Sequence, residues 1–120
     1  MGKYVDGFVM PLATENVEKY REMAQRAGKI WKEHGALEFY ETVGDDLEIK
    51  DMLSFKTTAG ASENETVIFS WIVFESREHR DQVNVAVMND PRLKEEMETG
   101  KTMVDFKRMA YGGFKTLVEI

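Results

Sequence analysis

The stretch that most constrains the fold is TVIFSWIVFE, residues 66–75. Only Glu75 carries a charge, and most other positions are β-branched or aromatic. A run this short and this apolar indicates a β-strand that is buried on both faces. We therefore expect residues 66–75 to form a central strand against which the rest of the chain packs.

The residues before this stretch predict a strand, a helix and a second strand. Residues 3–12 are apolar on both parities, which indicates a largely buried strand. Residues 14–34 repeat apolar side chains every three or four positions, as an amphipathic helix does, and Thr14 is the expected N-cap. Residues 36–43 are typical of a half-exposed strand, and residues 52–55 are a candidate for a short edge strand.

The residues after the central stretch predict two helical pieces and a closing strand. Ser76 is placed to cap the first helix, and Asp90 to cap a second one that begins with Pro91 and ends at Gly100. From about residue 105 to residue 119 the chain returns to strand.

The resulting order is strand, helix, strand, strand, helix, strand. It predicts an α+β fold with ferredoxin-like βαββαβ topology, formed by residues 1–120 as one domain. Right-handed crossovers place both helices on one face of an antiparallel sheet. The first and third strands are then the inner pair, and the last strand lies beside the first. Gly7 and Phe8 are thus expected near Gly113 and Phe114.

The other face of this sheet has no helix to cover it. The inner strand is nevertheless apolar on both parities, with Phe69 and Trp71 on one side and Ile72 and Phe74 on the other. Soluble monomers rarely expose apolar patches larger than a few hundred Å². We therefore predict a homodimer in which two sheets pack face to face around a twofold axis.

Charge and composition exclude several classes of partner. The net charge of −6 argues against nucleic-acid binding. No apolar run approaches the roughly 20 residues that span a bilayer, so no membrane partner is expected. The chain has no cysteine, which fits a cytoplasmic protein without disulfides.

Metal and cofactor sites are not predicted. His34 and His79 are the two histidines, and neither has a second histidine at ligand spacing. A structural or catalytic metal needs three or four ligands. The phosphate-binding and nucleophile motifs are also lacking. We expect His34 to close its helix and His79 to pack locally.

Four segments carry a resemblance to a known family. They are ENETVIFSWIVFESREHRDQVNVAVMNDPRLKEEM, the opening KYVDGFV, the segment WKEHGALEFYE and the closing FKRMAYGGF. Together they resemble the DUF1428 family over about the whole chain. The resemblance implies membership of the dimeric α+β barrel group, which agrees with the predicted dimer, and it implies no established activity.

The dimeric α+β barrel group includes haem-degrading and cofactor-independent monooxygenases. By resemblance to these, the catalytic candidates are Asp6 on the first strand, Trp71 on the third and His79 on the following helix. Asp6 departs from the group, which has asparagine there, and an anion would bind an oxyanion poorly. The alternative is that Trp71 belongs to the core, Asp6 pairs with Arg108 and His79 is an ordinary helix residue.

The pairing of the first and last strands gives a second set of candidates. It places Asp6, Arg108 and Tyr111 near one another, toward the bare face of the sheet, where a partly desolvated charged pair would mark a ligand site. We therefore predict a homodimer that binds a small molecule between its sheets. The alternative is an oxygenase-like enzyme, either cofactor-independent or haem-dependent.

Overall fold

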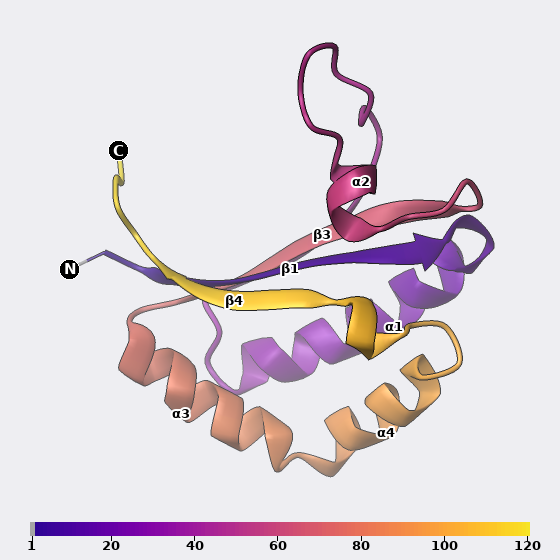
Figure 1. The fold of residues 1–120 in the computed structure, drawn as a ribbon. Coiled ribbons are helices and arrows are strands. Elements are labelled where there is room, and N and C mark those ends of the chain that lie inside the picture. The colour runs from indigo at the N-terminus through magenta and orange to yellow at the C-terminus, as the bar shows by residue number, and fades with distance from the viewer. Residues whose placement is uncertain (1) are drawn as a thin grey trace.

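A computed structural model describes residues 2–120 of the chain. Within these residues, four strands form one antiparallel sheet in the order β2-β3-β1-β4 (Figure 1). The strands are β1 (Tyr4–Ala13), β2 (Glu38–Val43), β3 (Glu65–Phe74) and β4 (Ala110–Lys115). β1 and β3 are the inner pair, so the prediction of a central strand at residues 66–75 is confirmed.

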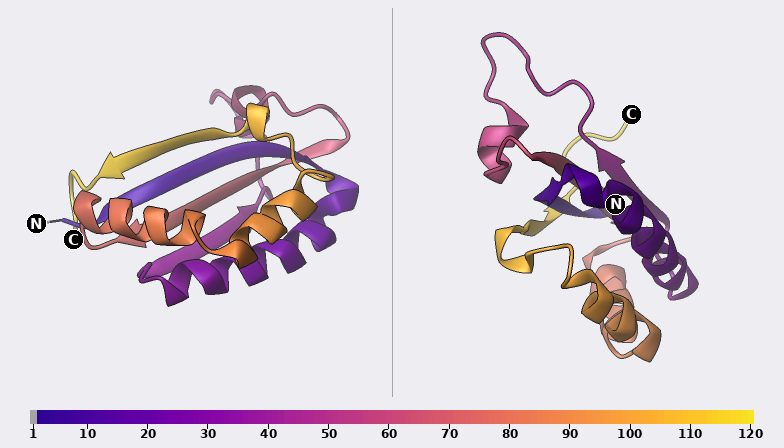
Figure 2. Two further views of the ribbon diagram at one scale, coloured as in Figure 1. Left: turned by 90° about the horizontal axis from the view of Figure 1, so that it is seen from below. Right: turned by 90° about the vertical axis from the view of Figure 1, so that its right-hand side faces the viewer.

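The helices lie on two sides of the sheet. α1 (Val17–Glu33), α3 (Arg77–Met88) and α4 (Pro91–Gly100) cover one face, whereas the short α2 (Phe55–Ala59) lies on the other (Figure 1). α1 runs beside α4 beneath the sheet (Figure 2). The predicted α+β, ferredoxin-like arrangement is confirmed, and α2 is an addition to it. None of the helices within residues 2–120 has the length and apolar character needed to cross a membrane.

Side-chain caps fix where two of the helices begin. Ser76 Oγ accepts a hydrogen bond from the His79 N–H (3.1 Å), and Asp90 Oδ1 accepts one from the Arg92 N–H (2.9 Å). Both predicted caps are confirmed. The prediction for Thr14 is wrong, because the chain first makes a 3₁₀ turn, η1 (Thr14–Asn16), and α1 then starts without a side-chain cap.

The segment between β2 and β3 differs from the predicted edge strand at residues 52–55. Phe55 instead begins α2, which Ser54 Oγ caps by accepting a hydrogen bond from the Lys56 N–H (3.1 Å). Gly60 ends this helix in the left-handed conformation (φ 68°). The edge-strand prediction is wrong because Ser54 and Gly60 supply both ends of a helical turn.

The closing strand is shorter than the predicted residues 105–119. A 3₁₀ turn, η2 (Phe106–Arg108), comes first, and β4 then pairs with β1. Gly7 lies opposite Gly112, and a Cβ on Gly7 would approach the Phe114 ring to 3.3 Å. The predicted proximity of the two glycine-containing segments is therefore confirmed, and the missing side chains leave room for the ring of Phe114.

The core lies between the sheet and the helices α1, α3 and α4. Met10 and Leu12 of β1, Ile72 and Phe74 of β3, and Val87 of α3 are almost fully buried in it. On each strand these residues share one parity, as a sheet with one covered face requires. The next residues in each strand therefore point to the opposite face.

The opposite face, which we call the open face, carries Tyr40, Phe69, Trp71 and Phe114. Phe55 of α2 packs on Phe69 (ring centroids 6.0 Å apart), and Tyr40 stacks on Trp71 (5.0 Å). Tyr40, Phe69 and Phe114 remain 50%, 45% and 62% exposed. α2 thus covers only part of the apolar surface that the sequence predicted here.

Candidate functional site

A cavity lies between the sheet and the helices α1 and α4, and we call it the chamber. Its volume is about 200 Å³, and most of its wall is apolar. The wall includes Met23, Ala27 and Trp31 from α1, Leu93 and Met97 from α4, and Phe8 and Phe39 from the sheet. The chamber therefore offers a small ligand an apolar environment under the helices.

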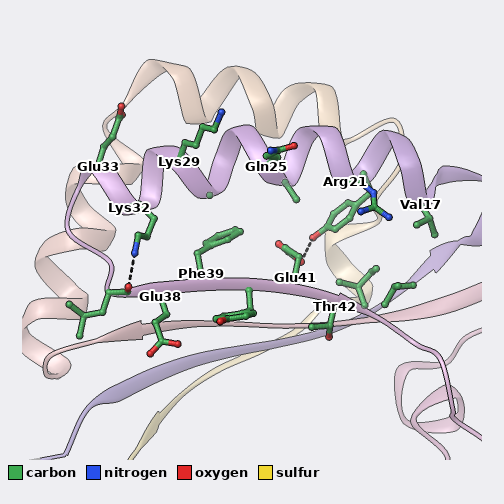
Figure 3. Close-up of a pocket in the computed structure, with 17 residues that line it drawn as sticks. Val17, Arg21, Gln25, Lys29, Lys32, Glu33, Glu38, Phe39, Glu41 and Thr42 are labelled. Atoms are coloured by element: carbon green, nitrogen blue, oxygen red, sulfur yellow. Dashed lines mark hydrogen bonds between the residues drawn. The ribbon is translucent and has the colours of Figure 1, made fainter.

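A larger groove, of about 910 Å³, runs along the outside of the chamber between α1 and the edge strand β2 (Figure 3). Tyr20, Ala24, Phe39 and Glu41 border both the groove and the chamber. In Figure 3, Phe39 and Glu41 point from β2 toward α1. The two spaces thus meet at these residues, which makes the groove the natural route into the chamber.

Three polar side chains converge where the groove meets the chamber. Tyr20 Oη donates a hydrogen bond to Glu41 Oε1 (2.8 Å), and Ser70 lies directly opposite Glu41 in the sheet. Tyr20 and Ser70 are 7% and 5% exposed. Burial raises the pKa of Glu41, although the Tyr20 and Ser70 hydroxyls lower it in part. Burial and the nearby Glu41 carboxylate raise the pKa of Tyr20 far above its usual value, so Tyr20 stays protonated.

Glu41 is not among the candidate site residues that the sequence predicts, because Glu38 and Glu41 both fit a half-exposed strand at residues 36–43. Side chains alternate along a strand, so the two glutamates point to opposite faces. Glu41 shares the face of Phe39, whose apolar ring belongs under α1. The shared parity of Phe39 and Glu41 is the sequence feature that could have placed Glu41 under α1.

Asp6 lies on the helix-covered face, in a second polar cluster, so the prediction that it points toward the bare face is wrong. It has the same parity as the core residues Met10 and Leu12 of β1. It is completely buried, and its Oδ1 is 3.1 Å from Arg80 Nε of α3. Tyr111 Oη donates a hydrogen bond to Asp6 Oδ2 (3.2 Å), and Arg80 Nη2 donates one to Tyr4 Oη (3.2 Å). Burial raises the pKa of Asp6, and the Arg80 guanidinium lowers it in part. The structure thus brings Asp6 and Tyr111 together, and their role in ligand binding stays a prediction.

Arg108 does not join this cluster, so the predicted pairing of Asp6 with Arg108 is wrong. Arg108 Nη1 donates to Glu65 Oε2 (2.9 Å), and Nη2 donates to the Gly60 carbonyl (2.7 Å). The reason is register. β4 begins only at Ala110, opposite Val9, so Arg108 lies beyond the pairing with β1 and reaches the start of β3.

The three catalytic candidates from the family resemblance are not assembled into one site. Trp71 lies on the open face, because its partner in β1 is Gly7, the neighbour of Asp6. His79 Nδ1 accepts a hydrogen bond from the Glu75 N–H (3.0 Å) at the start of α3. Asp6 and Trp71 therefore lie on opposite faces of the sheet, and the His79 side chain binds the backbone at the start of α3.

The histidines do not form a metal site with other residues. His34 Nε2 lies 2.8 Å from Asp90 Oδ2 at the end of α1, and His79 is held as described. Within residues 2–120, no three His, Cys, Asp or Glu side chains are grouped as metal ligands would be.

Comparison with known proteins gives one family and close relatives. Residues 3–107 match the family described as "Protein of unknown function (DUF1428)". The Escherichia coli K12 protein YbaA, described as uncharacterized, is 43% identical over 118 residues, which are 98% of each chain. YbaA of Shigella flexneri matches with the same identity and coverage.

Solved structures with the same fold come from more distant proteins. A dimeric ferredoxin-like protein from an uncultured marine organism has a TM-score of 0.62 at 10% identity and covers 100% of both chains. A NIPSNAP family protein of unknown function from Agrobacterium tumefaciens has a TM-score of 0.60 at 17% identity, covering 96% of this chain and 88% of its own. A Nitrosomonas europaea protein provisionally described as an antibiotic biosynthesis monooxygenase has a TM-score of 0.57 at 13% identity. The match covers 98% of this chain and 93% of that protein. At these identities the likeness concerns the fold alone.

Proposed function

Since the chain belongs to the DUF1428 family, a family of proteins of unknown function, we propose a function from its own geometry: it is a homodimer that binds a small ring compound in the chamber. The family match and the YbaA relatives confirm the resemblance to this family that the sequence showed. The proposed site lies under the helices. A further site between the two sheets of a dimer stays a prediction.

The size and chemistry of the chamber carry this proposal. An apolar cavity of about 150 Å³ holds a benzene molecule, and the chamber measures about 200 Å³. Binding sites are mostly apolar with a few convergent polar groups, and the chamber has Tyr20, Glu41 and Ser70 at its entrance. The expected ligand is therefore a neutral ring compound with one hydrogen-bonding substituent.

The open face supports the dimer. Its exposed aromatic residues form the kind of patch that marks a protein interface. The marine ferredoxin-like protein, which has the same fold, is described as dimeric. Two identical open faces can cover each other around a twofold axis.

Calorimetry with phenol, toluene and benzoate tests the ligand class. Phenol is expected to bind up to about tenfold more tightly than toluene, because its hydroxyl gains one hydrogen bond at Glu41. Benzoate is expected to bind least, because its charge would be buried beside the Glu41 carboxylate.

A chamber-filling variant provides the control. Ala27→Phe places a ring in the chamber and is expected to abolish phenol binding, whereas Val85→Phe adds the same ring at an exposed position of α3 and should leave binding intact. Equal phenol affinity in both variants would exclude the chamber as the site.

An oxygenase-like enzyme is the second candidate, and the half-buried Trp71 stacked on Tyr40 is the observation in its favour. Adding haem and recording the spectrum tests the haem-dependent form, for which a Soret shift is expected. His34 and His79, the usual kind of haem ligand, are both absent from the chamber wall. Trp71→Phe tests the cofactor-independent form, which would lose oxygen-consuming activity.

A further inference from the structure

We propose that Glu41 is a proton acceptor, so that the chamber removes an acidic C–H or O–H proton from a bound ring compound. Tyr20 is the positioning residue that holds the carboxylate in place. This inference rests on the proposed function, because the compound must first occupy the chamber.

The position of Glu41 provides the geometry. Its carboxylate lies at the junction of the groove and the chamber, between α1 and the sheet. A carboxylate can accept about four hydrogen bonds; Tyr20 takes one of them through Oε1, and the Ser70 hydroxyl also faces the carboxylate. Acceptor capacity therefore remains for a proton of a molecule inside the chamber.

The absence of a neighbouring cation distinguishes Glu41 from Asp6 and from the partly buried Glu65. Among residues 2–120, Asp6 has Arg80 and Glu65 has Arg108, whereas no lysine or arginine forms an ion pair with Glu41. Burial without a cation raises the pKa of Glu41. A base whose pKa is closer to the working pH abstracts protons more effectively.

None of the other charged groups near Glu41 forms an ion pair with its carboxylate in the described part of the chain. Glu96 of α4 lines the chamber, and its carboxylate accepts a hydrogen bond from Arg26 Nε (2.8 Å). Arg21 borders the groove, and its guanidinium is bound to Glu18 (3.1 Å). The remaining charged groups of the groove are Lys29, Lys32, Glu33 and Glu38.

The probe for this activity is 5-nitrobenzisoxazole, a small apolar ring compound with one acidic C–H. Glu41 takes the proton from C3, the C–H electron pair forms the second π bond of a nitrile, and the ring N–O bond breaks with its electrons moving to oxygen. The product is a coloured cyanonitrophenolate, and Glu41 returns the proton to water. No oxidant or cofactor is needed.

Wild type is expected to open the ring with a rate that rises with pH through a single midpoint above the ordinary glutamate value of 4.5. Glu41→Gln should reduce kcat/KM by about a hundredfold or more, the usual contribution of a general base. Glu41→Asp should keep part of the rate. Tyr20→Phe should move the pH midpoint upward, because it removes a hydrogen bond that stabilises the carboxylate. The exposed Glu48→Gln should behave as wild type.

Binding and turnover are measured separately. Calorimetry of the probe with Glu41→Gln, which binds without consuming it, reports occupancy of the chamber. Binding together with an equal ring-opening rate in wild type and Glu41→Gln would overturn the proton-acceptor role and leave the proposed function standing. No binding of the probe and no binding of phenol would overturn both. Should Glu41→Gln fail to fold, the Tyr20→Phe pH midpoint decides, and an unchanged midpoint overturns the inference.

Discussion

Asp6, Glu41 and Glu65 each hold a carboxylate partly or wholly out of water, and they differ in the cation beside them. Arg108 lies 2.9 Å from Glu65 and lowers its pKa to about 2. At Asp6, burial outweighs the nearby Arg80 and raises the pKa. At Glu41 no cation opposes burial. The direction of each pKa shift therefore follows from the balance between burial and the nearest arginine.

The Glu65–Arg108 pair predicts a pH-dependent stability. The pKa of Glu65 falls from 4.5 to about 2 on folding, so the stabilisation is fully present above pH 4.5 and is lost as the pH falls through about 2. Arg108→Met is therefore expected to lower the free energy of unfolding at pH 7 and to have little effect near pH 2. The effect at pH 7 is modest, because Arg108 is 39% exposed.

Urea unfolding at pH 7 and at pH 2.5 measures this change, with the neighbouring Lys107→Met as the control. A difference between Arg108→Met and wild type that stays constant over this pH range would contradict the linkage.

The buried Asp6–Arg80 pair predicts a larger loss. Their side chains are only 1% and 16% exposed, and removing one partner of a buried pair costs about 3–5 kcal/mol. Arg80→Met should lose about that much in urea unfolding at pH 7. The double variant Asp6→Asn with Arg80→Met should recover part of it, because no unpaired charge remains. The exposed Arg77→Met serves as control, and equal losses in the single and double variants would argue against an unpaired charge as the cause.

Single residues were predictable where the cause is local. The caps at Ser76 and Asp90 depend on a few consecutive residues, and the sequence contained them. The partner of Asp6 was not predictable, because it depends on where β4 begins and on how α3 crosses the sheet. Strand pairing correctly predicted that Tyr111 lies near Asp6, although on the opposite face of the sheet from the one expected. Arg108 does not reach Asp6, because the 3₁₀ turn η2 precedes β4.

At the level of elements, the contact between α1 and β2 depends on Gly28. A Cβ at this position would lie 2.7 Å from Cδ1 of Phe39. The absent side chain lets the helix approach the strand closely enough to place Tyr20 on Glu41. The groove and chamber entrance are therefore shaped by this glycine.

Gly28→Ala is expected to lower the free energy of unfolding by about 1–3 kcal/mol, as overpacking does, although alanine favours helix by about 1 kcal/mol. Adding Phe39→Leu should restore part of the loss by making space. Glu22→Ala, on the exposed side of α1, is the control for helix propensity. Thermal and urea unfolding measure all three variants, and a Gly28→Ala protein as stable as wild type would show that Phe39 moves aside freely.

Long continuous or periodic apolar patterns made the long elements predictable, whereas the short elements lack such a pattern. β1, β3, α1 and α3 follow from patterns of ten or more residues. α2 has only five residues, whose cap and terminal glycine also occur in loops. The sequence therefore predicted the sheet order but not the helix on the open face, and it could not reveal a chamber that arises from the spacing of α1 and α4 over the sheet.

At the scale of the whole molecule, the helices cover the two faces of the sheet to different extents. The helices α1, α3 and α4 bury most of one face, whereas α2 leaves aromatic residues of the other face exposed to water. Burying one such side chain stabilises association by about 1.5–3 kcal/mol. A second copy would bury the same residues twice, once on each subunit, which makes the open face the expected dimer interface.

Light scattering of the wild-type chain at micromolar concentration is therefore expected to give twice the mass of one chain. Phe114→Asp should give a monomer, because the dimer would bury an unpaired charge on each subunit and lose both aromatic rings, which together weaken association by about a hundredfold or more. Phe114 is 62% exposed in the single chain, so the variant should fold. Val85→Asp introduces the same charge at a 63% exposed position on the helix side and should remain dimeric. A dimer that persists in Phe114→Asp but dissociates in Val85→Asp would place the interface on the helices instead, and the open face would then need another partner.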